Sequence, residues 1–245
     1  MHDFFHQVTR LPDASGPRDP RHPGWPEASP KVALNDGRCL RLRPLTWRDG
    51  GEWARQRRAD ESWLRPVEPT QRGGWHRAHE RDAWQANFSF LRTAAKKGTV
   101  VPLVIDIDGR FAGQVTIGNI QHGALSEAWI GYWVHSPYMG AGVATAACAL
   151  GVDHAFERIG LHRLTATYLP TNPASGRVLA KCGFHNEGFL RANLHIDGRW
   201  RDHHFVALLA DEYASTCVAR QIEAGRCAAW HEGRPRAGRY TIHES

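Results

Sequence analysis

The sequence predicts an α+β fold: a single domain with a mixed, mostly antiparallel sheet flanked by helices. Three strand patterns follow one another over residues 101–134, separated only by the turns Asp108-Gly109 and His122-Gly123. Turns this short join antiparallel neighbours. Three strands in succession, without crossover helices between them, also exclude a doubly wound parallel sheet.

The first elements precede these three strands. Residues 39–45 alternate apolar and basic side chains, which is typical of a half-buried strand. Thr46 is suited to cap a helix over residues 47–58. Residues 74–97 carry apolar side chains at helical spacing and end before Gly98, which predicts one longer amphipathic helix.

Helices and strands alternate after the three strands, and a hairpin closes the domain. The predicted elements are, in order, a helix from Val143, a strand over 161–169, a helix over 172–183, two strands over 184–209 joined at Asp197-Gly198, and a helix over 211–225.

The chain of 245 residues is long enough for one domain with tails. Residues 1–30 hold six of the 14 prolines and show no apolar periodicity, which predicts a flexible or loosely docked tail. We expect a Pro-rich tail over 1–37, the domain over 38–210, and a C-terminal helix and tail over 211–245. The last twenty residues are expected to be loosely ordered.

Composition narrows the class of protein. Hydrophobic residues make up 42% of the chain and charged residues 23%, which is typical of a soluble globular protein. No apolar run is long enough to cross a bilayer, and the first residues lack the pattern of a secretory signal, so we expect a cytoplasmic protein without a membrane partner. The five widely spaced cysteines predict reduced thiols, and no histidine pattern predicts a metal site.

The net charge of +6 arises in the middle of the chain. Residues 39–210 contain 21 basic and 15 acidic residues, whereas each flank holds five of either sign. A basic domain suits an anionic partner, either a polyphosphate cofactor or a nucleic acid. No RNP motif, zinc finger or long Lys/Arg block is present, so we expect no direct nucleic-acid readout.

A phosphate cradle is predicted where a strand runs through Gly140 and Gly142 into a helix. Glycines allow close approach of a ligand to the backbone. The helix start adds N–H groups without partners and a partial positive charge, which together suit a pyrophosphate. The predicted binding residues are Gly140, Ala141, Gly142, Val143, Ala144 and Thr145.

These residues also resemble a family motif. Residues 139–144 (M-G-A-G-V-A) resemble the acetyl-CoA signature Q/R-x-x-G-x-G/A of the GNAT acetyltransferase superfamily, with Met139 in place of the usual Gln or Arg. Residues 172–175 (N-P-A-S) and 181–184 (K-C-G-F) resemble the segments that close a GNAT core. The resemblance spans about residues 38–210 and implies acetyl-CoA as co-substrate, with no metal.

Three further stretches resemble the RimJ/RimL group of that superfamily. They are residues 63–69 (W-L-R-P-V-E-P), residues 130–133 (I-G-Y-W), and the closing hairpin with Gly188-Phe189-Leu190, Asp197-Gly198 and Asp202. This resemblance implies acetylation of the N-terminal α-amine of a protein, such as a ribosomal protein. A small-molecule amine is the alternative acceptor.

The chemistry of acetyl transfer indicates roles for single residues. Backbone N–H groups near Tyr132, Trp133 and Val134 are expected to hold pantetheine and to stabilise the oxyanion. Asn172 is expected to bind the pantetheine arm. Ser175 is expected either to protonate the leaving thiolate or to cap its helix.

The proton acceptor is less clearly marked. Related enzymes have a glutamate just before I-G-Y-W, where this chain has Trp129. Glu127, two residues earlier on the same face of the strand, is the candidate base. An α-amine with a pKa of about 7.7–8.0 is also partly neutral in solvent, so a base is not essential. The departures at Trp129 and Met139 leave open a non-catalytic module that binds acetyl-CoA on the ribosome.

Overall fold

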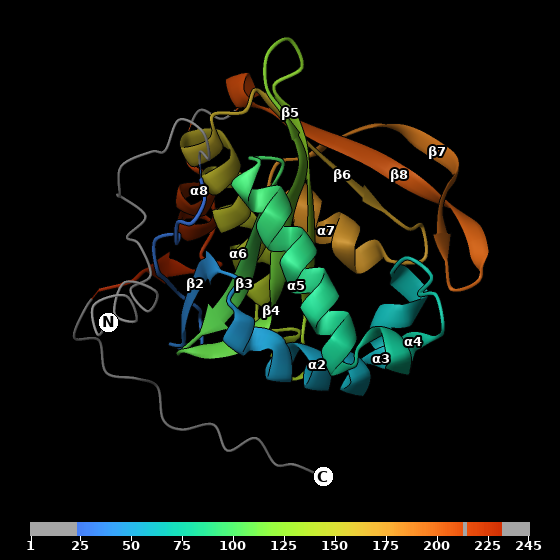
Figure 1. The fold of residues 1–245 in the computed structure, drawn as a ribbon. Coiled ribbons are helices and arrows are strands. Elements are labelled where there is room, and N and C mark those ends of the chain that lie inside the picture. The colour runs from blue at the N-terminus through green and yellow to red at the C-terminus, as the bar shows by residue number, and fades with distance from the viewer. Residues whose placement is uncertain (1–23, 213–214, 232–245) are drawn as a thin grey trace.

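A computed structural model describes residues 24–212 and 215–231 (Figure 1). In this part of the chain one sheet has the order β7-β8-β6-β5-β4-β3-β2-β1-β9. All pairings between these strands are antiparallel except that of β5 with β6. The prediction of a mixed, mostly antiparallel sheet flanked by helices is confirmed.

The strands are β1 (Val32–Ala33), β2 (Cys39–Pro44), β3 (Val100–Ile107), β4 (Arg110–Gln121), β5 (Glu127–Val134), β6 (Arg163–Tyr168), β7 (His185–Ile196), β8 (Arg199–Leu209) and β9 (Ala228–Ala229). The α-helices are α2 (Gly50–Ala59), α3 (Glu61–Leu64), α4 (Trp75–Ala78), α5 (Arg81–Lys96), α6 (Val143–Asp153), α7 (Pro173–Lys181) and α8 (Cys217–Glu223). Short turns of other helix types are η1 (Trp47–Asp49), η2 (Arg65–Val67), η3 (Ser136–Tyr138), η4 (His154–Ile159) and η5 (Ala210–Glu212).

Helices cover both faces of the sheet. The larger core lies between the strands and α6, which is buried along almost its whole length. Gly151 allows this close packing, because a Cβ there would lie 2.8 Å from the Ile130 side chain. A smaller core on the opposite face joins Trp53 of α2 and Trp84 of α5 to the sheet. None of the helices within the described ranges has the length and apolar character to span a bilayer.

The predicted helix over 74–97 is broken into α4 and α5. The break falls at His79, whose buried ring donates from Nδ1 to the carbonyl oxygen of Trp75 at 2.6 Å. In a continuous helix that carbonyl would accept the backbone N–H of His79, which instead bonds His76. The ring also packs against Trp53 and Trp75, so aromatic packing outweighs the helical pattern here.

The ordered domain extends past both predicted boundaries. The carbonyl oxygen of Gly24 accepts a hydrogen bond from His154 Nε2 at 2.6 Å, and Ser29 exchanges two hydrogen bonds with Leu42. Strand β1 pairs with both β2 and β9, so residues on either side of 38–210 complete the sheet. The described residues before Cys39 therefore pack on the core instead of forming a tail, whereas residues 1–23 and 232–245 lie outside the described residues.

Candidate active site

The parallel strands β5 and β6 separate in the middle of the sheet. They are paired only at their N-terminal ends, and the last pair is Trp129 with Thr165. Beyond that pair the two strands diverge (Figure 1). Strand β5 leads to the start of α6 and strand β6 to the start of α7, so both helix starts lie at the open end.

The alternation of a strand decides which backbone groups face this opening. The N–H of His135 donates to Ala112 on the β4 side, so the odd-numbered residues before it also direct their backbone groups to β4. The N–H groups of Tyr132 and Val134 therefore point into the opening. Trp133, which was predicted to contribute in the same way, directs its backbone toward β4.

The residues of the predicted phosphate cradle lie at the open end and have the backbone geometry that such a site requires. Gly140 and Gly142 both have positive φ, 79° and 77°, a conformation that favours glycine. The first intrahelical hydrogen bond of α6 runs from Ala146 N–H to the Gly142 carbonyl. The N–H groups of Val143, Ala144 and Thr145 consequently have no partner within the helix and are directed past its start.

Two cationic side chains, Lys181 and Arg226, border the cradle. Sequence reasoning did not find them. A hollow of about 300 Å³ is lined by Asn35, Asp36, Gly140, Ala141, Gly142, Thr145, Lys181, Gly225 and Arg226. Lys181 ends α7, within the K-C-G-F stretch that the resemblance already singled out. Arg226 lies in the segment expected to be loosely ordered, and no local pattern connects it with Gly142, more than eighty residues earlier.

Asn172 and Ser175 both lie at the start of α7. Asn172 caps α7, because its Oδ1 accepts the N–H of Ser175 at 3.3 Å. Ser175 is therefore not the cap. Its Oγ lies 3.1 Å from the hydroxyl of Tyr132 on β5. This contact spans the opening between the two strands.

Burial raises the pKa of Tyr132 well above its usual value of 10. The Tyr132 phenol is consequently protonated at physiological pH and can act as a hydrogen-bond or proton donor. Its neighbour Ser175 can both donate and accept, so the pair can pass on a proton.

Tryptophans line the opposite face of β5. The Trp129 indole lies across Gly118 of β4, where a Cβ would come within 2.3 Å of the ring, and it is 44% exposed. Trp133 is on the same face, and its indole N–H donates to Gln114 Oε1 at 3.3 Å. Gly131 lies between the two indoles, and a Cβ there would be 3.3 Å from the Trp129 ring, which therefore also borders this residue.

Arg57 packs against Trp133. Its guanidinium lies over the rings of Trp53, Trp75 and Trp133, at 5.5, 5.3 and 5.1 Å. Cation–π contacts of this kind are stronger when the cation is shielded from water. The guanidinium also forms an ion pair with Glu68. The charge of the Glu68 carboxylate is thereby neutralised.

Glu127 lies at the paired end of β5. Its carboxylate forms an ion pair with Arg163 Nε at 3.0 Å, and Arg163 also binds Glu187. Tyr132 lies five positions after Glu127 on the extended strand, about 16 Å along the backbone. The structure therefore does not bring the two predicted catalytic residues, Glu127 and Ser175, together.

Two of the three stretches that resemble the RimJ/RimL group, residues 63–69 and the closing hairpin, meet in space. Arg65 Nε donates to Asp197 Oδ1 at 2.7 Å, which joins the stretch 63–69 to the turn of the closing hairpin. Thr70 Oγ1 accepts the N–H of Gly198 at 2.9 Å, and residues Pro69 and Ile196 are bridged. The hairpin and the α3 region thus form one wall beside the exposed face of β5.

No metal centre is found in the described residues, since no three His, Cys, Asp or Glu side chains cluster there as ligands. All five cysteines are free thiols, as predicted.

Comparison with known proteins identifies the family. The family described as "Acetyltransferase (GNAT) domain" matches residues 39–185, more than half of the chain. The protein belongs to the GNAT acetyltransferase family and is an acetyl-CoA-dependent N-acetyltransferase.

Three relatives indicate its place within the family. The structure of Mycobacterium smegmatis RimJ in complex with CoA-disulfide has a TM-score of 0.82 and 45% identity, covering 84% of this chain and 99% of that one. The Escherichia coli [ribosomal protein uS5]-alanine N-acetyltransferase is 28% identical over 78% of this chain and 97% of its own length. The probable N-acetyltransferase YjcK of Bacillus subtilis is 45% identical over 102 residues, which is 42% of this chain and 56% of that protein.

Proposed function

We propose that the protein transfers the acetyl group of acetyl-CoA to the N-terminal α-amine of a protein, and that this acceptor is a ribosomal protein. The observation that carries the proposal is the 45% identity to RimJ over 99% of that chain. It is supported by the relative that is named for acetylating an alanine of ribosomal protein uS5.

The cofactor residues of this proposal surround the open end of β5 and β6. The N–H groups of Val143, Ala144 and Thr145 bind the pyrophosphate at the positive end of α6. The pantetheine arm lies in the opening and takes hydrogen bonds from the N–H groups of Tyr132 and Val134, in the manner of an added strand. Asn172 lies at the start of α7, which also faces the opening, and its side-chain amide binds the same arm.

The acetyl transfer then proceeds by direct attack of the amine on the thioester carbonyl. The two reactants are held in line, which supplies much of the acceleration. Backbone N–H groups of β5 stabilise the oxyanion of the tetrahedral intermediate. When the C–S bond breaks, Tyr132 donates its proton to the departing thiolate and is reprotonated through Ser175. The amine loses its proton to solvent, because Glu127 is held by Arg163 at the other end of the strand.

The charges of the side chains around the site favour a peptide acceptor over a polyamine. The carboxylates Glu68 and Glu127 on this side of the sheet, and Asp197 in the hairpin turn, are each ion-paired with an arginine. A polyamine carries several positive charges and needs carboxylates that are not already neutralised. The adjoining hairpin exposes Arg199 and Arg201 beside the Asp202 carboxylate, so basic side chains outnumber the acidic one there.

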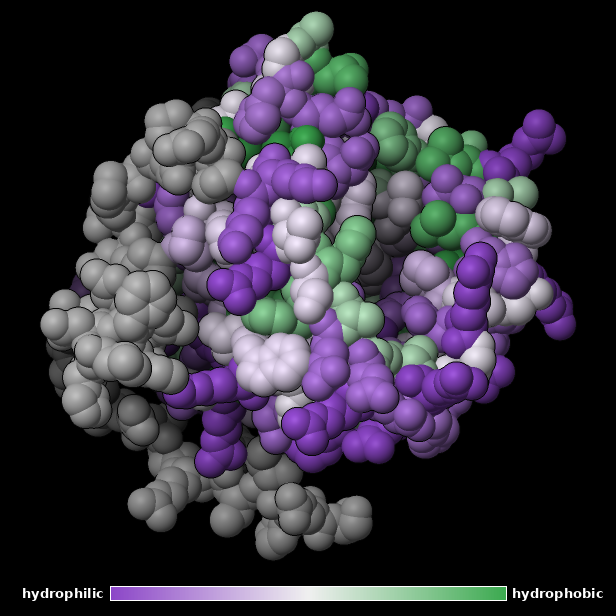
Figure 2. Space-filling model, in the orientation of Figure 1, coloured by the Kyte–Doolittle hydropathy of each residue, from purple (hydrophilic) through white to green (hydrophobic). Residues whose placement is uncertain are grey.

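Exposed apolar side chains provide a second argument for a peptide. Trp200, Phe189 and Leu194 of the hairpin are 66, 50 and 38% exposed. Figure 2 shows hydrophobic residues at the upper right of the molecule, where Figure 1 has β7 and β8. Aromatic side chains of this kind contribute strongly to protein contacts.

A competition assay tests the proposal. A library of N-terminal peptides is incubated with acetyl-CoA beside spermidine and beside the same peptides with blocked α-amines, and products are identified by mass spectrometry. We expect acetylation of free α-amines of a subset of peptides, at kcat/KM values at least tenfold above that for spermidine. Faster acetylation of spermidine, or no turnover of any peptide, would refute the proposed acceptor.

A further inference from the structure

The segment after β8 lies against the phosphate cradle. Helix α8 packs against α6, and β9 forms the edge of the sheet beside β1. Between these two elements, the carbonyl oxygen of Arg226 lies 3.7 Å from the position that a Cβ on Gly142 would take. The backbone after α8 thus borders the residue at which the cradle helix begins.

Buried hydrogen bonds join α8 to both cradle helices. The Asp153 carboxylate at the end of α6 accepts the N–H groups of Cys217 and Val218, at 2.6 and 3.1 Å. This satisfies two N–H groups that the start of α8 leaves without helical partners. Gln221 is 1% exposed, and its Nε2 donates to the carbonyl oxygen of Lys181 at 2.9 Å. Helix α8 is thereby fixed to the end of α6 and to the end of α7.

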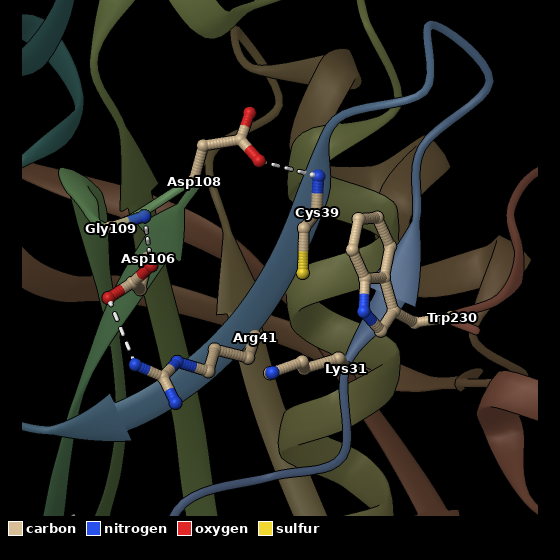
Figure 3. A pocket seen from close by; sticks show the side chains of 7 residues that line it. All are labelled: Lys31, Cys39, Arg41, Asp106, Asp108, Gly109 and Trp230. Carbon is tan, nitrogen blue, oxygen red and sulfur yellow. Dashed lines mark hydrogen bonds and ion pairs between the residues drawn. The ribbon is translucent and has the colours of Figure 1, made fainter. Parts of the chain in front are cut away.

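The far end of the segment is anchored on the sheet edge. Cys227 is buried, and β9 pairs with Val32 and Ala33 of β1. Figure 3 shows the Trp230 indole beside Cys39 and Lys31, lining a hollow of about 190 Å³. Residues 224–227 are consequently held at both ends, by α8 on one side and by β9 on the other.

Arg226 is held between these anchors. Its backbone N–H donates to the Gln221 carbonyl at 2.9 Å, and its Nη1 donates to Gln221 Oε1 at 3.0 Å. Asn35 Nδ2 binds the carbonyl oxygen of Gly225 at 3.1 Å from the other side. The guanidinium is exposed toward the hollow that it lines with Lys181. Neither cation forms an ion pair within residues 24–212 and 215–231.

We infer that the segment 217–230 is a wall of the acetyl-CoA site and that Arg226, with Lys181, binds phosphate groups of the cofactor. This inference rests on the proposed use of the cradle at Gly142. A guanidinium presents several N–H donors in a plane and suits phosphate oxygens. Because Gln221 already orients the side chain, binding costs less conformational entropy than for a free arginine. Among the described residues that line the hollow, the one carboxylate is Asp36, which is paired with Arg38 at 2.6 Å and does not neutralise these cations.

Calorimetric titration of single variants tests the inference. Arg226→Ala is expected to raise the Kd of acetyl-CoA at least tenfold, and Lys181→Ala to raise it by a similar or smaller factor. Arg226→Lys keeps the charge and is expected to recover part of the affinity. Arg92→Ala on the exposed side of α5 removes the same charge far from the hollow and is expected to leave Kd unchanged. Melting temperatures are measured for every variant, because only folded protein is compared.

The same titrations with acetyl-3′-dephospho-CoA identify the phosphate. If Arg226→Ala loses the same affinity for both cofactors, Arg226 binds the pyrophosphate. If it loses affinity for acetyl-CoA alone, Arg226 binds the 3′-phosphate. Either result supports the inference. An unchanged Kd in both Arg226→Ala and Lys181→Ala, with normal binding by the wild type, would overturn it while leaving the proposed function intact. Failure of the wild type to bind acetyl-CoA would overturn the cradle assignment itself.

Discussion

Gly142 offers a test in which charge is separated from backbone strain. We compare Gly142→Asp with Gly142→Asn, because the two side chains are nearly the same size and both tolerate positive φ better than most residues. Among the residues that the structure describes, the heavy atom within 4 Å of a Cβ at this position is the Arg226 carbonyl oxygen, at 3.7 Å, which is an ordinary contact. Either variant should therefore fold, with a similar cost from its φ of 77°.

The difference between the two variants measures the interaction with phosphate. A carboxylate about 6 Å from one phosphate charge, at an effective dielectric constant of about 40 for an open hollow, is disfavoured by about 1.4 kcal/mol. This corresponds to about tenfold in Kd. We expect Gly142→Asp to bind acetyl-CoA at least tenfold more weakly than Gly142→Asn. This difference in Kd should become smaller in about 1 M salt, where charges are screened within about 3 Å.

Isothermal titration calorimetry at low and high salt provides both measurements, and thermal unfolding checks the fold. Asparagine is the matched control, since it introduces the same atoms without the charge. Equal affinities of the two folded variants at low salt would show that no phosphate lies at the start of α6. The assignment of Gly140 to Thr145 as the cradle would then be abandoned.

Three other predictions follow from single side chains. Tyr132→Phe should lower kcat by about 10²-fold without changing the Kd of acetyl-CoA, and Ser175→Ala should lower it less, as expected when a general acid or its relay is lost; a full kcat in Tyr132→Phe would remove the proton-donor role. Glu127→Gln should keep kcat/KM within about threefold, and a loss of about 10²-fold that shrinks at high pH would instead identify Glu127 as the base. His79, whose pKa is lowered by burial and by Arg57 to about 4, should make the protein less stable between pH 6.5 and 4.

The sign of the His79 effect follows from proton binding. The folded state holds His79 neutral, while the unfolded chain binds a proton below the ordinary pKa of about 6.5. Stability from this residue is therefore complete above pH 6.5 and is lost as the pH falls toward 4, by up to about 3 kcal/mol. Urea unfolding of the wild type and of His79→Gln at a series of pH values measures this. Equal pH dependence in both proteins would contradict the prediction.

Local patterns predicted the parts of the fold that depend on neighbouring residues. The turns Asp108-Gly109 and Asp197-Gly198 fixed the hairpins, and the glycines 140 and 142 marked the cradle, because each needs a backbone conformation that few residues adopt. The cap of α7 could have been predicted in the same way but was not: Asn172 precedes a proline at the first helical position, the usual arrangement of a helix start, whereas Ser175 was considered as the cap.

Long-range contacts could not be read in the same way. Arg226 reaches the cradle only because α8 is fixed by a carboxylate in another helix, a pairing of Asp153 with Cys217 that no local spacing indicates. The break in the helix at His79 likewise depends on tryptophans from two different helices. Glu127 was placed on the correct face of its strand, but its partner Arg163 belongs to the next strand, and that ion pair decides where its carboxylate is held.

Strand β5 separates the two reactants by the alternation of its residues. Tyr132 and Val134 direct their backbone N–H groups into the opening, and the Tyr132 phenol meets Ser175 beside α7. Trp129 and Trp133 direct their side chains to the opposite face, where the α3 region and the closing hairpin form the wall. Under the proposed function, the even-numbered positions hold the cofactor and receive the thiolate, while the odd-numbered positions shape the approach of the amine. Because the two sets do not overlap, an indole at position 129, where related enzymes have a glutamate, leaves the cofactor side undisturbed. We propose that the acceptor amine then meets an aromatic surface and loses its proton to solvent.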